Sequence, residues 1–352
     1  MIRKTYASIE KKLHPDVDKS DFSYKDLKAE ITHRDKEIIN EILDFINIYQ
    51  FELLDGTGEW EWLQNNKQSQ YINGLKNKDY NLLCELFTNM FRNEVTYGYV
   101  SPSFSDLNNQ KIKKESSSDI LCNIDTCFEF TNIQNLEQLV TNVKCGMPFG
   151  KKFNKGYILP DTPRHFYYAT KIFNLESLSN TPSILEIGGG YGGLCKELWE
   201  IYQKKCTLIN IDLLPGLLSA YYFLKTCNIP VKFIFDENDI SQNFVNLVPV
   251  KLLNKINSKK NMLDLIFNSR SLCEMDKNSN NEYINFINNS NASYFYHENS
   301  NFLLFPDSER HVEILSDEFM VDKNKYNLLQ ASITPFSGGD GRYREYIYKK
   351  IQ

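Results

Sequence analysis

The alternation of hydrophobic and polar positions divides this chain into a helical first part and a mixed second part. Apolar residues recur every three or four positions in four early segments, as on the buried face of a helix. Polar residues dominate 105–119 and predict a loop or linker, whereas glycines and prolines through 147–163 predict irregular structure. The helical spacing predicts helices over 38–49, 82–91, 135–143 and 165–173.

Beyond residue 180, short apolar runs alternate with helical patterns. This alternation indicates crossover connections between strands and therefore a largely parallel sheet. Near the end of the chain, two strand-like runs flank a glycine-rich loop and predict an antiparallel hairpin. The apolar runs predict strands over 183–187, 207–211, 231–235, 263–267, 292–296, 328–334 and 343–348, with helices over 194–202, 217–227 and 282–288.

The expected fold class is therefore α/β. We expect a Rossmann-like sheet, mostly parallel with a C-terminal antiparallel hairpin, preceded by a mainly helical N-terminal domain. The length of 352 residues suits about two domains. We place the helical domain at 1–145, where it would cover an acceptor site or form a dimer, and the Rossmann-like domain at 146–352.

Charge and composition narrow the function classes. The net charge is −5 and no long basic run occurs, which argues against a nucleic-acid partner, because phosphate neutralisation supplies most of such affinity. No apolar stretch approaches the ~20 residues that span a bilayer, and the N-terminus lacks the apolar segment of a secretory signal, so we expect a cytoplasmic protein. The eight cysteines form no CxxC pair, and we expect reduced thiols.

A glycine cluster follows the first predicted strand of the sheet, where parallel sheets bind their ligands. The segment 186–193 reads Glu-Ile-Gly-Gly-Gly-Tyr-Gly-Gly, and three of its glycines also fit the spacing of a dinucleotide-binding loop. Glu186 decides between these possibilities, because a carboxylate at the strand end repels a pyrophosphate and favours a sulfonium cofactor with a protonated amine. The pattern predicts S-adenosylmethionine as the cofactor, held around Gly188, Gly190 and Gly192.

Asp212 ends the next predicted strand, where a carboxylate can accept hydrogen bonds from two ribose hydroxyls. Its spacing from the glycines suits one βαβ unit. The C-terminal hairpin favours a methyltransferase over a dehydrogenase, because the last strand of the methyltransferase sheet is inserted antiparallel.

Four segments resemble the putative sugar O-methyltransferases found in bacterial surface-polysaccharide and nucleotide-sugar gene sets, a family of class I S-adenosylmethionine-dependent methyltransferases. The segments are Leu185–Leu194, Ile211–Leu213 with Ala220–Leu224, Asn268–Met275 and Arg342–Tyr346. The resemblance covers the chain from about residue 145 onward, and it departs from the family pattern in the additional leucine before Pro215. It implies a sugar hydroxyl as acceptor and further cofactor contacts at Tyr191, Leu213, Asn268 and Ser269.

The fourth predicted strand ends as Asn-Ser-Arg-Ser over 268–271, without the prolines typical of enzymes that methylate exocyclic amines of bases. Oxygen is therefore the expected acceptor, and a hydroxyl needs a general base to take its proton. His297, after the fifth predicted strand, and Glu274, in the loop after the fourth, are the two candidates. Arg164 and His165 could reach over the cofactor or an acidic sugar.

The favoured function is base-assisted, in-line methyl transfer to a sugar hydroxyl of a nucleotide sugar or surface polysaccharide precursor. The expected partner is a small-molecule or glycan substrate, with a homodimer as a further possibility. We expect no nucleic acid, no membrane span and no metal, because the sequence assembles no cluster of carboxylates. Three alternatives stay open: an NAD(P)-dependent oxidoreductase, a nucleic-acid methyltransferase, and a non-catalytic methyltransferase-like partner subunit.

Overall fold

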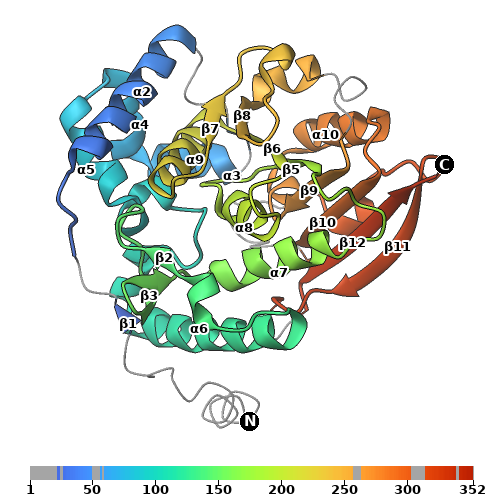
Figure 1. Ribbon diagram of the computed structural model, residues 1–352, viewed down its shortest axis with the longest axis horizontal. Helices are drawn as coiled ribbons and strands as arrows, with labels where there is room; N and C mark the ends of the chain where they lie inside the picture. Colours follow the sequence, from blue (N-terminus) through green and yellow to red (C-terminus); the bar gives the residue numbers. More distant parts are fainter. Residues whose placement is uncertain are drawn as a thin grey trace.

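An eight-stranded mixed sheet forms the centre of the protein (Figure 1). The computed structural model describes residues 22–23, 27–49, 56–57, 59–256, 263–302, 314–337 and 341–351. Across the sheet the strands follow the order β11, β12, β10, β9, β5, β6, β8, β7. They are β5 (Ser183–Ile187), β6 (Thr207–Asp212), β7 (Val231–Phe233), β8 (Val245–Pro249), β9 (Leu265–Ser269), β10 (Tyr294–Ser300), β11 (Tyr326–Ile333) and β12 (Tyr343–Lys350).

Strand direction confirms the expected fold class. All neighbours from β10 to β7 are parallel, whereas β12 is inserted antiparallel between β10 and β11. The central strands β5, β6 and β9 are almost entirely buried, which explains why they read as continuous apolar runs instead of alternating patterns. The protein is thus an α/β protein with a mostly parallel sheet and a C-terminal antiparallel hairpin.

Strand β8 was not predicted from the sequence. Its five residues are all buried, although they include an asparagine and a proline that interrupt the apolar pattern. The structure accommodates Asn246 because its amide donates hydrogen bonds to the carbonyl oxygens of Leu208, at 3.1 Å, and Ser241, at 3.0 Å. A buried polar side chain with such partners is compatible with a central strand.

Helices connect these strands and pack on the sheet. Helix α7 packs against both α8 and α6, and α9 packs against β6, β7 and β8. The helices of this part are α7 (Thr162–Phe173), α8 (Gly193–Ile201), α9 (Leu214–Thr226) and α10 (Lys277–Asn289). Single 3-10 turns are η1 (Met90–Arg92), η2 (Glu94–Thr96), η3 (Phe104–Asn108), η4 (Leu136–Leu139), η5 (Glu237–Asp239), η6 (Val250–Lys255), η7 (Leu272–Glu274) and η8 (Ser316–Glu318).

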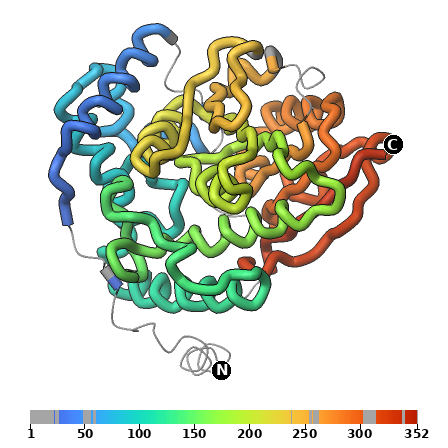
Figure 2. Tube along the Cα trace, in the orientation of Figure 1, coloured from blue at the N-terminus to red at the C-terminus, as the bar shows by residue number. Residues whose placement is uncertain are grey.

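The first part of the chain is mainly helical and packs directly on the α/β part. Figures 1 and 2 show α2, α4 and α5 beside β7 and α9, and α6 along α7, with the C-terminal hairpin at the edge opposite α2. Tyr71 donates a hydrogen bond to the carbonyl of Pro215 at 2.8 Å, and Tyr222 donates one to Asp35 at 2.6 Å. Both parts contribute to one continuous hydrophobic core. The helices are α2 (His33–Tyr49), α3 (Glu59–Asn66), α4 (Ser69–Asn77), α5 (Tyr80–Thr88) and α6 (Gln110–Phe130).

Three predictions in this first part were wrong. The polar segment 105–119 belongs largely to η3 and the long helix α6, because Asn109 caps the helix and its apolar face begins only near Ile120. Segment 135–143 forms a short 3-10 turn followed by a strand, and 147–163 contains a hairpin. The small antiparallel sheet has the order β1 (Phe22–Ser23), β3 (Gly150–Phe153), β4 (Gly156–Ile158), β2 (Thr141–Asn142).

Within the part of the chain that the structure describes, no helix combines the length and apolar character needed to cross a membrane.

Candidate active site

The glycine segment forms a tight turn between β5 and α8. Gly188, Gly190 and Gly192 have φ values of 70°, 52° and 82°, a region that side-chain-bearing residues rarely adopt. At Gly188 a Cβ atom would lie 2.1 Å from the hydroxyl oxygen of Ser271, so the turn packs closely against the loop after β9. The sequence therefore requires glycine here for both conformation and space.

Glu186 lies near the end of β5 with its side chain at the wall of a cavity. Its side chain is 6% exposed, and burial raises the pKa of the carboxyl group to about 7. The thiol of Cys195 donates a hydrogen bond to it at 3.4 Å, which opposes the shift, whereas the nearby charge of Asp212 adds to it. A cation placed beside Glu186 would favour its ionised form.

Asp212 ends β6 on the other side of the glycine turn. Its carboxylate accepts hydrogen bonds from the backbone N–H groups of Gly190 and Leu213, both at 2.6 Å. Burial nevertheless raises the pKa of Asp212 to about 6. A carboxylate has about four acceptor positions, so two remain for hydroxyl groups of a ligand.

Two adjoining cavities open beside this turn. The larger, of about 370 Å³, is lined by polar and charged side chains that include Glu186, Arg164 and Glu274. The smaller, of about 90 Å³, is lined mainly by apolar side chains together with Asp212 and Leu213. The cavities share the lining residues Trp60, Tyr99, Gly188 and Ser271. Together they form one cleft with a polar end and an apolar end, which we call the strand-end cleft.

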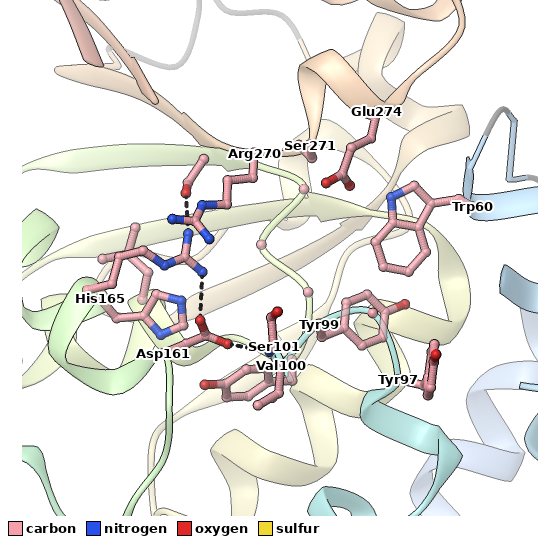
Figure 3. Close-up of a pocket in the computed structure, with 18 of the residues that line it drawn as sticks. Trp60, Tyr97, Tyr99, Val100, Ser101, Asp161, His165, Arg270, Ser271 and Glu274 are labelled. Carbon is pink, nitrogen blue, oxygen red and sulfur yellow. Dashed lines mark hydrogen bonds and ion pairs between the residues drawn. The ribbon is translucent and has the colours of Figure 1, made fainter. Parts of the chain in front are cut away.

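The N-terminal part supplies one wall of the strand-end cleft. Trp60 of α3 stacks on Tyr99 with ring centroids 4.8 Å apart (Figure 3). The Tyr99 ring lies over the glycine turn, since a Cβ atom on Gly190 would be 3.0 Å from its Cδ1 atom. Sequence analysis did not identify either aromatic residue, because nothing in the local pattern places them near the glycines.

His297 does not line the cleft. Strand β10 continues to Ser300, so this residue lies inside the strand instead of after it. Its ring is fully buried and stacks against Phe295 and Tyr346 at centroid distances of 5.0 and 4.9 Å. Burial lowers its pKa to about 3. This placement contradicts the prediction that His297 is the general base, because the imidazole lines neither of the two cavities beside the glycine turn.

Glu298, the next residue, instead forms a network with side chains that line the larger cavity. Its buried carboxylate accepts a hydrogen bond from Ser269 at 3.2 Å and pairs with Arg270 at 3.3 Å. Adjacent strand residues point to opposite faces, so the one-residue difference decides which side chain contacts the residues that line the cleft. Arg164, which the sequence analysis singled out, joins this network by donating to Ser269 at 2.9 Å and to Asp161 at 3.3 Å.

Glu274 and His165 both line the larger cavity. Figure 3 shows Glu274 on the side of Trp60 and His165 beside Asp161 on the opposite side. Burial, and then the charge of Arg164, holds the pKa of His165 well below its usual range, so this imidazole is neutral at physiological pH. The structure therefore leaves Glu274 as the sequence-predicted base that lies in the cleft.

Of the other residues predicted to bind the cofactor, some line the larger cavity and others support the glycine turn from within the protein. Tyr191 and Ser269 line the larger cavity. Asn268 is fully buried beneath the turn, where it donates a hydrogen bond to the carbonyl of Ile187 at 2.9 Å. Asn268 therefore supports the turn from below, and Gly192 contributes by its backbone conformation as the N-terminal boundary of α8.

No group of three or more metal-ligating side chains occurs among the residues that the structure describes. His311 lies outside the described residues. The residues of the larger cavity that the sequence analysis missed include Arg270, Ser271, Arg342 and Tyr343. They belong to the segments that resemble the sugar methyltransferases, so that resemblance contained a signal for them.

Comparison with known proteins gives only partial matches. No protein-family model and no curated protein matches the chain. Among solved structures, the pyocyanin biosynthetic protein PhzM is 12% identical over 55% of this chain and 56% of its own, with a TM-score of 0.37. A SAM-dependent methyltransferase from Aquifex aeolicus is 14% identical over 53% of this chain and 92% of its own, with a TM-score of 0.39. The small RNA methyltransferase HEN1 is 14% identical over 58% of this chain, with a TM-score of 0.41.

The present chain spans little more than half the length of PhzM and 27% of HEN1. The α/β fold of this chain is established by its own strand order and by the antiparallel insertion of β12.

Proposed function

We propose that this protein is an S-adenosylmethionine-dependent O-methyltransferase that acts on a sugar hydroxyl of a nucleotide sugar or surface polysaccharide precursor. The observation that carries the proposal is the pair of acidic side chains, Glu186 and Asp212, on either side of a left-handed glycine turn. Such a turn next to carboxylates suits a cationic donor, whereas the phosphates of a dinucleotide would be repelled.

The residues of the cleft fit the parts of this cofactor. The apolar cavity beside Asp212 suits an adenine ring, and the carboxylate of Asp212 can accept hydrogen bonds from ribose hydroxyls. Glu186 lies in the polar cavity, where it would attract the amine and the sulfonium. Gly188 lines both cavities, and a Cβ atom there would collide with Ser271, which also lines both. When bound, the cofactor supplies a methyl group already activated toward nucleophiles.

The chain itself would align the acceptor and remove its proton. Glu274 lies across the cleft from His165, on the side of Trp60 (Figure 3). A carboxylate there can take the proton of an attacking hydroxyl while the new carbon–oxygen bond forms. The aromatic pair of Trp60 and Tyr99 covers the turn and would exclude water from the reacting groups.

The position of Trp60 and Tyr99 in the cleft suggests what the N-terminal part does. We propose that residues 1–145 cover the acceptor site, because Trp60 and Tyr99 belong to that part and line both cavities. The cytoplasm remains the expected location, where activated sugars are made. The Asn-Ser-Arg-Ser sequence at the end of β9 supports oxygen as the methyl acceptor. The resemblance of four segments to sugar O-methyltransferases supports a sugar as the substrate.

Calorimetry tests the cofactor. S-adenosylhomocysteine and S-adenosylmethionine are expected to bind the purified protein with micromolar affinity, and NAD is expected not to bind. Binding of NAD in preference to S-adenosylhomocysteine would instead support the oxidoreductase alternative. Strongly salt-dependent RNA binding would support a nucleic-acid methyltransferase.

Mass spectrometry of surface glycans tests the acceptor. A deletion strain is expected to lack one methyl group, about 14 Da, on a single sugar. Complementation with Glu274→Gln is expected not to restore it, because loss of a general base lowers turnover by about 10²–10⁴-fold. The exposed Glu282 on α10 provides the matched control, and Glu282→Gln should restore the methyl group. Unchanged glycans in the deletion strain would contradict the sugar assignment.

A further inference from the structure

Three arginines and four carboxylates of the described residues line the polar cavity of the strand-end cleft. The carboxylates of Glu186 and Asp212 lie at the ends of β5 and β6. The side chains of Arg270 and Arg342 line the same cavity from the half of the sheet that holds β9 and β12: Arg270 follows β9, and Arg342 precedes β12. Because β12 begins opposite Ser300, at the carboxyl end of β10, both arginines lie at the same edge as the glycine turn. This end of the cleft is the one left for an acceptor.

Arg270 is held rigidly in place. Its φ is 65°, an unusual backbone conformation for a residue with a side chain. The guanidinium lies 4.0 Å over the ring of Tyr343, and it pairs with the buried carboxylate of Glu298 at 3.3 Å. It also donates a hydrogen bond to the carbonyl of Phe336 at 3.3 Å. A planar guanidinium fixed in this way is preorganised to bind an oxyanion.

Arg164 lies next to this site with unused hydrogen-bonding capacity. Its side chain is buried, and two of its nitrogens donate to Ser269 and Asp161. Its Nε–H group has no hydrogen-bond partner among the residues that the structure describes. This Nε atom is closed off from solvent, so Arg164 contributes its positive charge to the neighbouring site.

We propose that the acceptor carries an oxyanion, a phosphate or a carboxylate, which Arg270 and Arg342 bind next to Arg164. This inference rests on the proposed function and specifies its substrate class: an anionic sugar derivative, not a neutral sugar. Tyr343 supports the site by stacking under Arg270. Glu274 lines the same cavity, so a hydroxyl of the anchored molecule could reach the proposed base.

The test measures binding of inorganic pyrophosphate, glucuronate and a neutral methyl glucoside by calorimetry, without any methyl donor. Arg342→Gln is the main variant, because Arg270 is part of the buried network with Glu298 and its loss risks misfolding. Arg34→Gln is the charge-matched control, since Arg34 is exposed on α2. Thermal melting establishes that each variant is folded.

The wild type is expected to bind pyrophosphate or glucuronate, but not the methyl glucoside. Arg342→Gln should weaken that binding at least tenfold, and Arg34→Gln should leave it within twofold. Preference for pyrophosphate assigns a phosphate group, and preference for glucuronate assigns a carboxylate. The affinity for S-adenosylhomocysteine should change less than twofold in Arg342→Gln.

The proposal is overturned if neither anion binds, or if Arg342→Gln binds the anion as well as the wild type does. It is also overturned if Arg342→Gln loses S-adenosylhomocysteine instead, because the arginine would then serve the donor. Failure of the proposed function is separate, since it would appear as a wild-type protein that does not bind S-adenosylhomocysteine.

Discussion

The raised pKa of Glu186 makes the affinity for the methyl donor depend on pH near neutrality. In the protein without ligand, burial raises the pKa of this carboxyl group to about 7. A ligand amine or sulfonium interacts favourably with the ionised carboxylate only. Protons therefore compete with the donor, and binding is expected to weaken as the pH falls through 7.

The size of the effect follows from the ionised fraction. An acid with a pKa of 7 is about 91% ionised at pH 8 and about 9% ionised at pH 6, so the apparent Kd should rise about tenfold. Asp212, with a pKa of about 6, adds about a factor of two if its ionised form is also required. At pH 7 the binding of one ligand should release about half a proton from Glu186.

Calorimetry with S-adenosylhomocysteine at pH 6, 7 and 8 measures this dependence, and buffers of different ionisation enthalpy report the released protons. Glu186→Gln cannot ionise, so it should bind weakly and with a much flatter pH profile. Any pH dependence that remains in Glu186→Gln comes from titration of the ligand amine, and it can be subtracted from the pH dependence of the wild type. A wild-type Kd that is constant between pH 6 and 8, or an equal slope in Glu186→Gln, would refute the electrostatic argument.

The stability of the ligand-free protein should change in the opposite direction. A carboxyl group whose pKa is raised on folding destabilises the fold once it ionises, so this cost is absent at low pH and complete above pH 7. Glu186→Gln should therefore raise Tm at pH 8, corresponding to at most about 3 kcal/mol, and this gain should shrink toward pH 5. A variant that is less stable at pH 8 would show that the carboxylate has a stabilising partner.

Three further substitutions test individual parts of the structure. Gly188→Ala should abolish donor binding, as measured by calorimetry, because its Cβ would lie 2.1 Å from the hydroxyl of Ser271 at a φ of 70°; binding within twofold of wild type would contradict the close packing. His297→Phe should leave the rate of methyl transfer within about twofold of wild type and the free energy of unfolding unchanged or about 1 kcal/mol higher. The reason is that the ring stacks in the core and its Nε2 is buried without a partner in the described structure. A hundredfold loss of turnover in a folded variant would restore His297 as a base. Tyr222→Phe should lower the free energy of unfolding in urea by about 1–3 kcal/mol, because it removes the buried hydrogen bond to Asp35; no change would mean that this contact between the two parts is unimportant.

Local sequence was sufficient to predict seven of the eight strands of the central sheet and its ligand-binding turn. The strands over 183–187 and 207–211 were located closely because a buried parallel strand must be an apolar run, and this requirement acts within the strand. The turn was also predictable, since the left-handed backbone at Gly188 and its neighbours strongly favours glycine over residues with side chains. Glu186 and Asp212 followed from their positions at the ends of these strands.

Only the tertiary structure decided which distant residues complete the cleft. Trp60 and Tyr99 lie more than 85 residues before the turn, and packing of the helical part on the sheet brings them to it. The base assignment depended on a further long-range feature, because pairing with β12 extends β10 to Ser300. Side chains alternate between the faces of a strand, so this extension buries His297 in the core and turns Glu298 toward the arginines. A pairing partner nearly fifty residues away cannot be read from the local pattern of either strand.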